Sequence, residues 1–245
     1  ADGMIRTGKP YFGRLITGLT KPKHAIPGTG FAGVIESCGE NSQKFQPGDR
    51  VFGETTVGFS ANAEYISISE NGVILKMPEN LSFPEAATYG DGHVTSMNFL
   101  KNIAKVKSGQ KVLINGASGS LGTAAVQIAK YFGAEVTGVC STRNVGLVKS
   151  LGADHVIDYT KKDLTKVDEK YDVIYDTVGK SSFSKSKNIL TESGLYVSPV
   201  LQFSLLLQML GTSVFGKKKA KFSATGMLKE NELRTLLAEL IEIFR

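Results

Sequence analysis

The sequence lacks any long hydrophobic run. In this chain of 245 residues the longest apolar stretch, around residues 201–210, is interrupted by Gln202, Ser204 and Gln208. It therefore stays short of the ~18 consecutive apolar residues that predict a membrane-spanning helix. The opening residues also carry no apolar signal-peptide core. We expect neither a membrane segment nor a secretory signal.

Cysteine and histidine are scarce. The two cysteines, Cys38 and Cys140, stand far apart in unrelated contexts, so a structural disulfide is not expected. This usage fits a reduced, cytoplasmic setting. The three histidines, His24, His93 and His155, are widely separated and have no partner thiols nearby in sequence. The sequence therefore predicts no zinc site.

Positive charge is in excess, with 29 Lys and Arg against 23 Asp and Glu, which gives a formal net charge of +6. One interpretation is a surface that binds nucleic acid or membranes. The other is a solvated surface with extra lysines, because the lysines are dispersed except for Lys217, Lys218, Lys219 and Lys221. No aromatic residues interleave with that run, so we favour the second interpretation.

The first 81 residues are rich in glycine and predict β structure with many turns. A turn is expected at residues 46–49. Short strands between such turns are typical of a small β barrel or sandwich. The expected strands cover residues 31–36, 50–52, 63–68 and 73–77.

The pattern changes at Ser82, which opens a capping box with Glu85. A helix should follow, broken near Gly90 and Gly92 and resumed over residues 94–103. Strands and helices then alternate, as in a doubly wound parallel sheet, and the last helix carries apolar residues at helical spacing over 233–244. The expected strands cover residues 111–115, 135–139, 155–157, 172–175, 195–198 and 221–225.

Three close-set glycines, Gly116, Gly119 and Gly122, join a short apolar strand at 112–114 to an apolar helix. This arrangement brings free N–H groups at the start of the helix to the carboxyl end of the strand. A glycine triplet alone is weak evidence, but the flanking strand and helix strengthen it. We predict that this loop binds a phosphate or pyrophosphate.

The next strand runs into Ser141, Thr142 and Arg143. An NAD site would place a carboxylate here for the ribose hydroxyl. Two hydroxyls and a guanidinium instead complement a 2′-phosphate, which predicts NADPH rather than NADH. The alternative is that Arg143 is an exposed residue of an ordinary loop.

Later strand ends should face the same crevice, because ligands of such sheets bind beyond the carboxyl ends of the strands. Tyr159 follows one strand, residues 176–179 end the next, and residues 198–200 end another. The Tyr159 hydroxyl could reach the adenosine phosphate, and Gly179 permits a close backbone approach. Each could equally be a plain loop, and their shared position is what groups them.

Several motifs together resemble a known family. Residues 115–122, 47–52, 150–154 and 176–179 match the medium-chain dehydrogenase/reductases, in the zinc-independent branch of quinone oxidoreductases and ζ-crystallin-like NADPH reductases. The resemblance covers essentially the whole chain. It implies an α/β architecture: a GroES-like β domain over residues 1–83, a Rossmann domain over 84–245 that ends in a linking helix, and an active site in the cleft between them.

The same resemblance implies roles for individual residues. It implies that three sets of residues bind NADP(H). Thr142 joins them because its hydroxyl belongs to the loop after the second strand, as described above. The nicotinamide side would contact Thr95, Thr177, Val178 and Gly179. The pyrophosphate would lie on Gly116, Ala117, Ser118, Gly119, Ser120 and Leu121, and the 2′-phosphate on Ser141, Arg143 and Tyr159.

The sequence departs from the family in two places. Zinc-dependent relatives have Gly-His-Glu where this chain has Gly28-Thr29-Gly30, so the metal-binding histidine is missing. Many quinone reductases have a tyrosine where residues 4–8 begin with Met4. Relatives also have strands before Asp2 and after the last helix, so we expect a piece of a longer protein or a deletion form, with a partial β domain.

These observations predict an NADPH-dependent enzyme that transfers a hydride to a quinone, an enone or another small carbonyl without zinc. Alternatives are a zinc-free, NADP-dependent alcohol dehydrogenase and a non-catalytic NADPH-sensing or RNA-binding protein. The catalytic residues are not assigned; His93, beside Asp91, is a candidate proton donor or else a helix-kink residue. We leave a homodimer open and expect no membrane or nucleic-acid partner.

Overall fold

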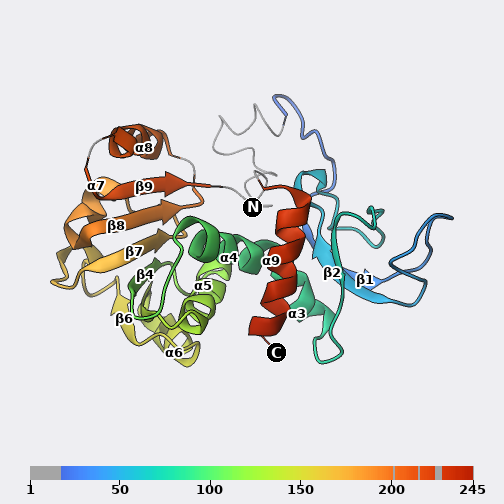
Figure 1. Ribbon diagram of the computed structural model, residues 1–245, viewed down its shortest axis with the longest axis horizontal. Helices are drawn as coiled ribbons and strands as arrows, with labels where there is room; N and C mark the ends of the chain where they lie inside the picture. The colour runs from blue at the N-terminus through green and yellow to red at the C-terminus, as the bar shows by residue number, and fades with distance from the viewer. Residues whose placement is uncertain (1–17, 201, 215, 224–227, 245) are drawn as a thin grey trace. The chain divides into compact units, whose positions relative to one another are not determined.

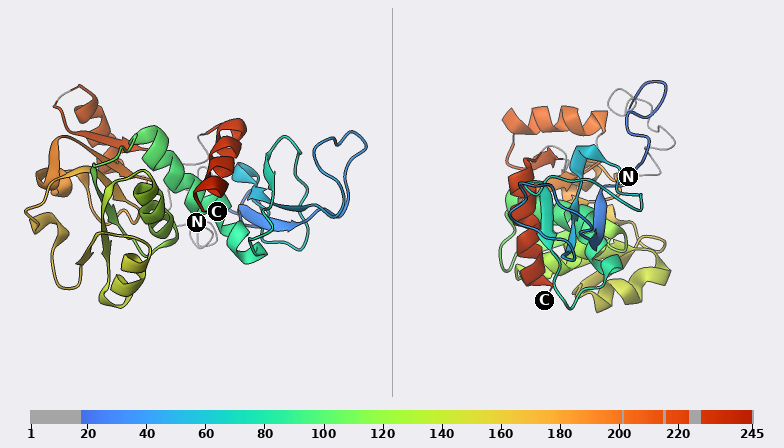
Figure 2. Two further views of the ribbon diagram at one scale, coloured as in Figure 1. Left: turned by 60° about the horizontal axis from the view of Figure 1, so that its bottom comes forward. Right: turned by 90° about the vertical axis from the view of Figure 1, so that its right-hand side faces the viewer.

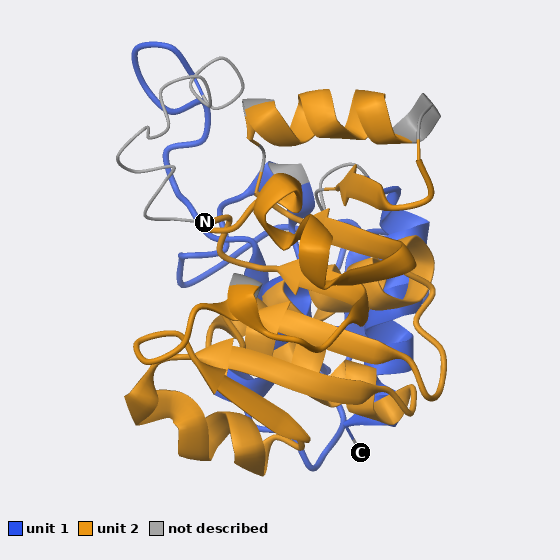
Figure 3. Cartoon of the chain, turned by 90° about the vertical axis from the view of Figure 1, so that its left-hand side faces the viewer, with its two compact units in different colours: residues 1–91, 228–245 blue, residues 92–227 orange. Residues whose placement is uncertain are grey.

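The computed structural model describes residues 18–200, 202–214, 216–223 and 228–244. The chain forms two compact units (Figure 3), which are described separately: unit 1 comprises residues 1–91 and 228–245, and unit 2 residues 92–227. The domain boundary between residues 83 and 84 stays a prediction. The last helix groups with unit 1 because it packs against a strand of that unit, rather than with the Rossmann unit as we expected.

Unit 1 is built on a three-stranded antiparallel sheet in the order β1-β2-β3. Phe31, Val51 and Ile74 form its buried cluster. The helix α3 packs against β1 and β2, and α9 packs against β3. The elements are β1 (Gly30–Val34), β2 (Arg50–Glu54), the short 3₁₀ helix η2 (Thr56–Gly58), β3 (Val73–Lys76), α3 (Phe83–Thr88) and α9 (Glu230–Ile243).

The strand expected over residues 63–68 is wrong, since this segment pairs with no strand among the described residues. Its alternating pattern is nevertheless real. Ile66 and Ile68 are half-buried against the cluster of Phe31, Val51 and Ile74. The period of two therefore records side-chain burial in an extended loop, without the hydrogen-bonded ladder that defines a strand.

The helix expected to break near Gly90 and Gly92 does not break. It widens into a π-helical turn over residues 89–93. A Cβ atom at Gly90 would lie 2.5 Å from the Gly53 carbonyl oxygen, and one at Gly92 would lie 2.5 Å from Ser120 Oγ. The glycines thus serve close packing rather than termination. The segment continues from α3 through η3 (Tyr89–His93), α4 (Val94–Met97) and η4 (Asn98–Ile103).

Unit 2 is a six-stranded parallel sheet in the order β6-β5-β4-β7-β8-β9 (Figure 1). In chain order this is 3-2-1-4-5-6, the doubly wound Rossmann arrangement, so the predicted fold of this part is confirmed. The strand order changes direction between β4 and β7. The strands are β4 (Lys111–Asn115), β5 (Glu135–Cys140), β6 (His155–Asp158), β7 (Tyr171–Asp176), β8 (Leu190–Ser198) and β9 (Lys219–Phe222).

The predicted strand at 111–115 is confirmed residue for residue, and Val112, Leu113 and Ile114 are completely buried. Strand β9 starts two residues earlier than expected and ends at Phe222; residues 224 and 225 lie outside the described part. Continuous apolar runs mark buried parallel strands well, because both faces of the sheet are covered.

The helices of unit 2 cover its sheet, as Figure 2 shows from two further directions. Helix α5 (Ser120–Tyr131) packs against β4 and β5, α6 (Val145–Ser150) against β5 and β6, and α8 (Phe203–Val214) against β9. Among the described helices, none is long and apolar enough to cross a membrane. Shorter helical turns are η5 (Thr142–Asn144), η6 (Leu164–Lys166), α7 (Phe183–Ser186) and η7 (Lys187–Ile189).

The capping box at the start of α3 gives the first prediction. Ser82 Oγ accepts from the Glu85 N–H at 3.5 Å, and Glu85 Oε2 accepts from the Ser82 N–H at 3.0 Å. Ser82→Ala should lower the free energy of unfolding by about 1 kcal/mol, measured by urea denaturation. Ser82→Gly is the matched control and should cost only a few tenths of a kcal/mol; equal losses would contradict the capping role.

Candidate functional site

The candidate site begins where β4 ends. Gly116 has a φ of 83°, in the left-handed region that glycine adopts readily. The N–H groups of Gly116 and Ala117 donate to the Val139 carbonyl at 3.1 and 3.0 Å. The Gly119 N–H donates to the Gly116 carbonyl at 3.0 Å. Gly119 is the N-cap of α5 and has no side chain to cap the helix. The first N–H groups of α5 are therefore available to a ligand.

The three glycines do different jobs. A Cβ atom at Gly116 would lie 2.3 Å from Val178 Cγ2, and one at Gly122 would lie 2.1 Å from the Gly116 carbonyl oxygen. Both positions thus exclude side chains, because the glycine loop packs closely against the loop after β7 and against the first turns of α5. Gly119 is exposed, and a Cβ there would meet its nearest neighbour, the Gly116 carbonyl oxygen, at 3.4 Å. The backbone at Gly119 is consequently accessible from solvent.

The loop after β5 is joined to the glycine loop through a residue that the sequence analysis missed. Asn144 Nδ2 donates to Ser118 Oγ at 2.9 Å and to Ser141 Oγ at 3.3 Å. This amide holds together a predicted pyrophosphate residue and a predicted 2′-phosphate residue. Asn144 stands one helical turn after Ser141, and that spacing is the signal that could have identified it.

A second missed residue lies at the end of β6. The Asp158 carboxylate accepts from Thr142 Oγ1 at 2.6 Å and from Thr160 Oγ1 at 2.7 Å. The Thr142 bond first, and then Thr160, hold the pKa of Asp158 below its ordinary value. The hydroxyl of Thr142 is thus already bound to a carboxylate, and Lys161 Nζ lies 3.7 Å from Asp158. A carboxylate therefore lies beside the end of β5, although it belongs to the neighbouring strand β6.

Arg143 and Tyr159, the other residues predicted at the 2′-phosphate, are both exposed. The Tyr159 N–H donates to the Cys140 carbonyl at 3.1 Å, so the chain leaving β6 is bound to the end of β5. Asp158 and Cys140 also face each other in the sheet register. The residues after β5 and β6 therefore lie together, as their shared position at the sheet edge predicted.

The end of β7 is organised by Asp176, which is completely buried. Asp176 Oδ1 accepts from Asn115 Nδ2 at 2.9 Å, and Oδ2 accepts from the Tyr196 hydroxyl at 2.8 Å. Burial, and then Asp176 itself, raise the pKa of Tyr196 above its ordinary value, so this hydroxyl stays a donor. Three backbone N–H groups also donate to Asp176, those of residues 178, 179 and 181.

These bonds fix the backbone of Thr177, Val178 and Gly179. Thr177 Oγ1 donates to the Asn115 carbonyl at 2.8 Å, which attaches the loop to the end of β4. Gly179 has a φ of 69°, and a Cβ there would lie 2.7 Å from Val200 Cβ. The predicted residues after β4, β7 and β8 are thus brought together at one edge of the sheet.

Thr95 and the start of α5 lie on packed helices. Thr95 is buried in α4, and α4 packs against α5. Ser96 Oγ donates to the Leu121 carbonyl at 2.8 Å, which holds α4 beside the first turn of α5. Ser120 is exposed at that first turn, while Leu121 is half-buried.

This arrangement fits a dinucleotide. The open backbone at Gly119, the unused N–H groups of α5 and its positive helix end suit a pyrophosphate. The hydroxyls and the guanidinium after β5 suit the adenosine ribose or its phosphate. Among the described residues, no group of three or more His, Cys, Asp and Glu side chains could hold a metal ion.

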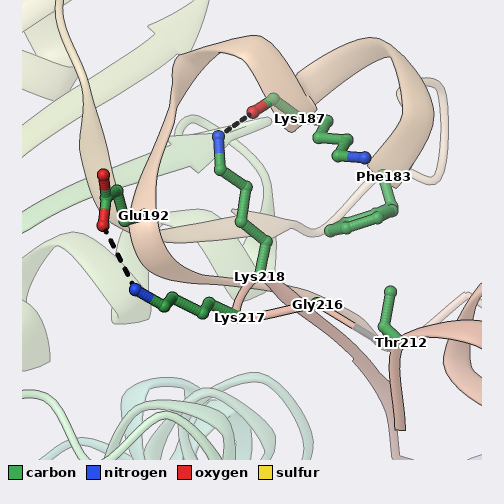
Figure 4. A pocket seen from close by; sticks show the side chains of 7 residues that line it. All are labelled: Phe183, Lys187, Glu192, Thr212, Gly216, Lys217 and Lys218. Carbon is green, nitrogen blue, oxygen red and sulfur yellow. Dashed lines mark hydrogen bonds and ion pairs between the residues drawn. The ribbon is translucent and has the colours of Figure 1, made fainter. Parts of the chain in front are cut away.

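A cavity of about 410 Å³ lies elsewhere in unit 2 (Figure 4). It is at the amino ends of β8 and β9, whereas the glycine loop is at the carboxyl ends of the strands, so it is not the dinucleotide site. Lys217 pairs with Glu192 at 3.6 Å, and Lys218 Nζ donates to the Lys187 carbonyl at 2.7 Å. The lining residues are Phe183, Lys187, Glu192, Thr212, Gly216, Lys217 and Lys218.

The different roles of the glycines give the second prediction. Gly122→Ala should lower the free energy of unfolding by about 1–3 kcal/mol or more, because its methyl group would overlap the Gly116 carbonyl. Gly119→Ala should change it by less than about 1 kcal/mol, because the backbone is extended and open there. Urea denaturation of both variants measures the difference. Equal stability of the two variants would contradict the packing described.

Comparison with known proteins connects this site to a family. A model described as "Zinc-binding dehydrogenase" matches residues 120–242, and one described as "Alcohol dehydrogenase GroES-like domain" matches residues 1–79. The chain is 37% identical over 185 residues to 2-methylene-furan-3-one reductase of Solanum lycopersicum, covering 72% of this chain and 47% of that protein. It is 30% identical over 213 residues to human quinone oxidoreductase, covering 80% and 64%.

Solved structures show the same fold. The quinone oxidoreductase of Coxiella burnetii superposes with a TM-score of 0.81 at 27% identity, covering 98% of this chain and 74% of that one. The Escherichia coli quinone oxidoreductase complexed with NADPH gives 0.77 at 24% identity, covering 94% and 74%. This chain spans about half to two thirds of the length of the two curated relatives. The predicted GroES-like and Rossmann architecture is confirmed, and the chain belongs to the medium-chain dehydrogenase/reductases, in the quinone oxidoreductase-like branch.

Proposed function

We propose that the protein is an NADPH-dependent oxidoreductase that reduces a quinone, an enone or another small carbonyl compound without zinc. The observation that carries the proposal is the glycine loop. Its middle glycine leaves the start of α5 open. Asn144 connects the loop to the end of β5, because its side-chain amide donates to both Ser118 of the loop and Ser141. A nicotinamide cofactor bound there supplies the hydride. The protein binds it, orients it and keeps water away.

The choice of NADPH rests on the loop after β5. Arg143 is exposed and Ser141 is half-buried beside Asn144, so both are available for a 2′-phosphate. Asp158 supports NADH as a second candidate cofactor, because a carboxylate can accept a hydrogen bond from the ribose 2′-hydroxyl of NADH and repels a 2′-phosphate. The negative charge of Asp158 is partly offset by Lys161, and its carboxylate already accepts hydrogen bonds from Thr142 and Thr160. We therefore retain NADPH as the cofactor.

The substrate class rests on the relatives. The tomato protein is named for reduction of a methylene-furanone, which is an enone, and the human one for quinones. We extend both activities to this protein as a proposal. NADPH oxidation with a panel of quinones, enones and aldehydes tests it, and reverse assays with NADP⁺ and alcohols test the alternative of a zinc-free alcohol dehydrogenase. Tight NADPH binding without turnover of any compound would contradict the proposal that the protein is an enzyme.

A non-catalytic RNA-binding role receives little support. Lys217 is paired with Glu192, and Lys218 Nζ donates to the carbonyls of Lys187 and Leu190. These two lysines therefore make contacts within the folded chain. The cytoplasmic location and the homodimer stay predictions.

The cofactor preference gives the third prediction. Arg143→Ala should weaken NADPH binding by about 10- to 150-fold, which corresponds to about 1.5–3 kcal/mol for a hydrogen bond to a charged group. NADH binding should change little, because NADH lacks the 2′-phosphate. Fluorescence titration of both cofactors measures the effect.

Asp158→Asn is the matched variant on the neighbouring strand. If NADPH is the cofactor, removing this negative charge should leave NADPH binding unchanged or strengthen it. Equal loss of NADPH and NADH binding in Arg143→Ala would contradict the assignment of Arg143 to the 2′-phosphate. A selective loss of NADH binding in Asp158→Asn would favour NADH as the cofactor.

A further inference from the structure

The cavity of about 410 Å³ in unit 2 has no part in the proposed cofactor site. Its lining comes from α7, η7, the start of β8, the end of α8 and the turn before β9 (Figure 4). All of these segments belong to unit 2. The volume lies near the lower end of the range of small-molecule pockets, which is about 300–1,000 Å³. The cavity therefore suits a small ligand.

Positive charge is concentrated on the lining of this cavity. Lys187 comes from η7, and Lys217 and Lys218 come from the turn before β9. Gly216, whose φ of 84° lies in the left-handed region, precedes these two lysines in the turn. Glu192 is the one acidic residue among the described lining residues. Three ammonium groups against one carboxylate give the lining a net charge of +2.

Two of the three ammonium groups are available to a ligand. Lys187 Nζ makes no hydrogen bond or ion pair with any residue that the structure describes. Lys217 Nζ lies 3.6 Å from Glu192 Oε2, but the two side chains are 80% and 90% exposed. An ion pair this exposed is weak, because water screens both charges. An anion in the cavity can therefore replace Glu192 as the partner of Lys217.

The third ammonium group is held in place by the backbone. Lys218 Nζ donates to the carbonyls of Lys187 and Leu190 at 2.7 and 2.9 Å. An ammonium group has three donors, so these two bonds leave one N–H group of Lys218 unused. The positive charge of Lys218 is thus fixed beside the cavity before any ligand binds.

Phe183 gives the cavity an apolar wall. It belongs to the buried cluster of unit 2, and its ring meets the Tyr196 ring edge to face with centroids 6.4 Å apart. The Thr212 hydroxyl is already used, since it accepts from the Ala220 N–H at 3.2 Å and donates to the Met209 carbonyl at 3.4 Å. The lining thus offers ammonium groups to an anion and an aromatic ring to an apolar group.

We propose that this cavity binds a phosphate monoester whose organic part is small and apolar. A phosphate monoester carries a charge of about −1.5 to −2 at neutral pH, which matches the net charge of the lining. Lys187 and Lys217 donate charge-assisted hydrogen bonds to the phosphate oxygens, and Phe183 packs against the organic part. A carboxylate carries a single charge and complements the lining less well. The site is separate from the glycine loop and does not depend on the proposed function.

The experiment titrates the full chain with phenyl phosphate and follows its amide NMR spectrum at low salt, because salt screens exposed charges. Inorganic phosphate and benzyl alcohol are titrated in parallel as the two halves of this probe. Lys187→Ala removes a free ammonium group, and Glu192→Gln removes the competing carboxylate. Lys185→Ala is the matched control, because Lys185 is an exposed lysine of α7 that does not line the cavity. Circular dichroism checks the folding of each variant.

The fourth prediction is the pattern of affinities. Phenyl phosphate should bind with a Kd of about 1 mM or below and shift the amides around residues 187, 192, 217 and 218. Lys187→Ala should weaken binding about tenfold, the lower end for a hydrogen bond to a charged group, because the site is open to water. Glu192→Gln should strengthen it about two- to fivefold, because Lys217 is then free. Lys185→Ala should leave it unchanged, and each half of the probe should bind more weakly than phenyl phosphate.

Four results would overturn the proposal. The first is the absence of a saturable shift up to about 10 mM phenyl phosphate, tenfold above the expected Kd. The second is a set of shifts centred on the amides of residues 116–121, which would put the phosphate at the glycine loop. The third is an equal loss in Lys187→Ala and Lys185→Ala, which would show that dispersed surface charge binds the anion. The fourth is equal affinity for inorganic phosphate and phenyl phosphate, which would leave Phe183 without a role.

Discussion

The carboxyl group of Asp176 holds together the edge of the sheet on which the proposed cofactor site depends. It is completely buried and accepts hydrogen bonds from the side chains of Asn115 and Tyr196 and from three backbone N–H groups. Burying a carboxyl group is unfavourable unless such bonds compensate it. Because the donors come from β4, β8 and the loop after β7, the three segments are fixed relative to one another.

This constraint reaches the glycine loop. The loop after β7 lies so close to Gly116 that a Cβ atom there would overlap Val178. On the other side, Asn144 joins the hydroxyls of Ser118 and Ser141. The glycine loop is therefore held from both sides by packed, hydrogen-bonded segments. A preorganised backbone of this kind binds a pyrophosphate with little loss of conformational entropy.

The sequence predicted the parts of the fold that depend on local pattern. The strand at 111–115 and the capping box at Ser82 are confirmed, because apolar continuity and capping chemistry are local signals. The strand at 63–68 was wrong, since alternation shows burial but cannot show which strand is available for pairing. The π-helical turn at 89–93 was missed for a similar reason, because close approach at Gly90 depends on residues distant in sequence.

The same distinction applies to the candidate site. The glycines and the residues after β5 were found because they follow a strand directly. Asp158 and Asn144 were missed, since their importance comes from other loops and strands: Thr142 hydrogen-bonds Asp158, and Asn144 donates to Ser118 of the glycine loop. A carboxylate on one strand cannot be paired with a hydroxyl on another until the register is known. Side chains that act across strands are the part of a site that sequence patterns predict least.

The most direct test of the account is the amide NMR spectrum of the protein during titration with NADPH. The account predicts that the largest shift changes concentrate on the amides of residues 116–121, 141–143 and 177–179, at the carboxyl edge of the sheet. Changes centred instead on the amides that line the 410 Å³ cavity, around Lys187, Lys217 and Lys218, would contradict it.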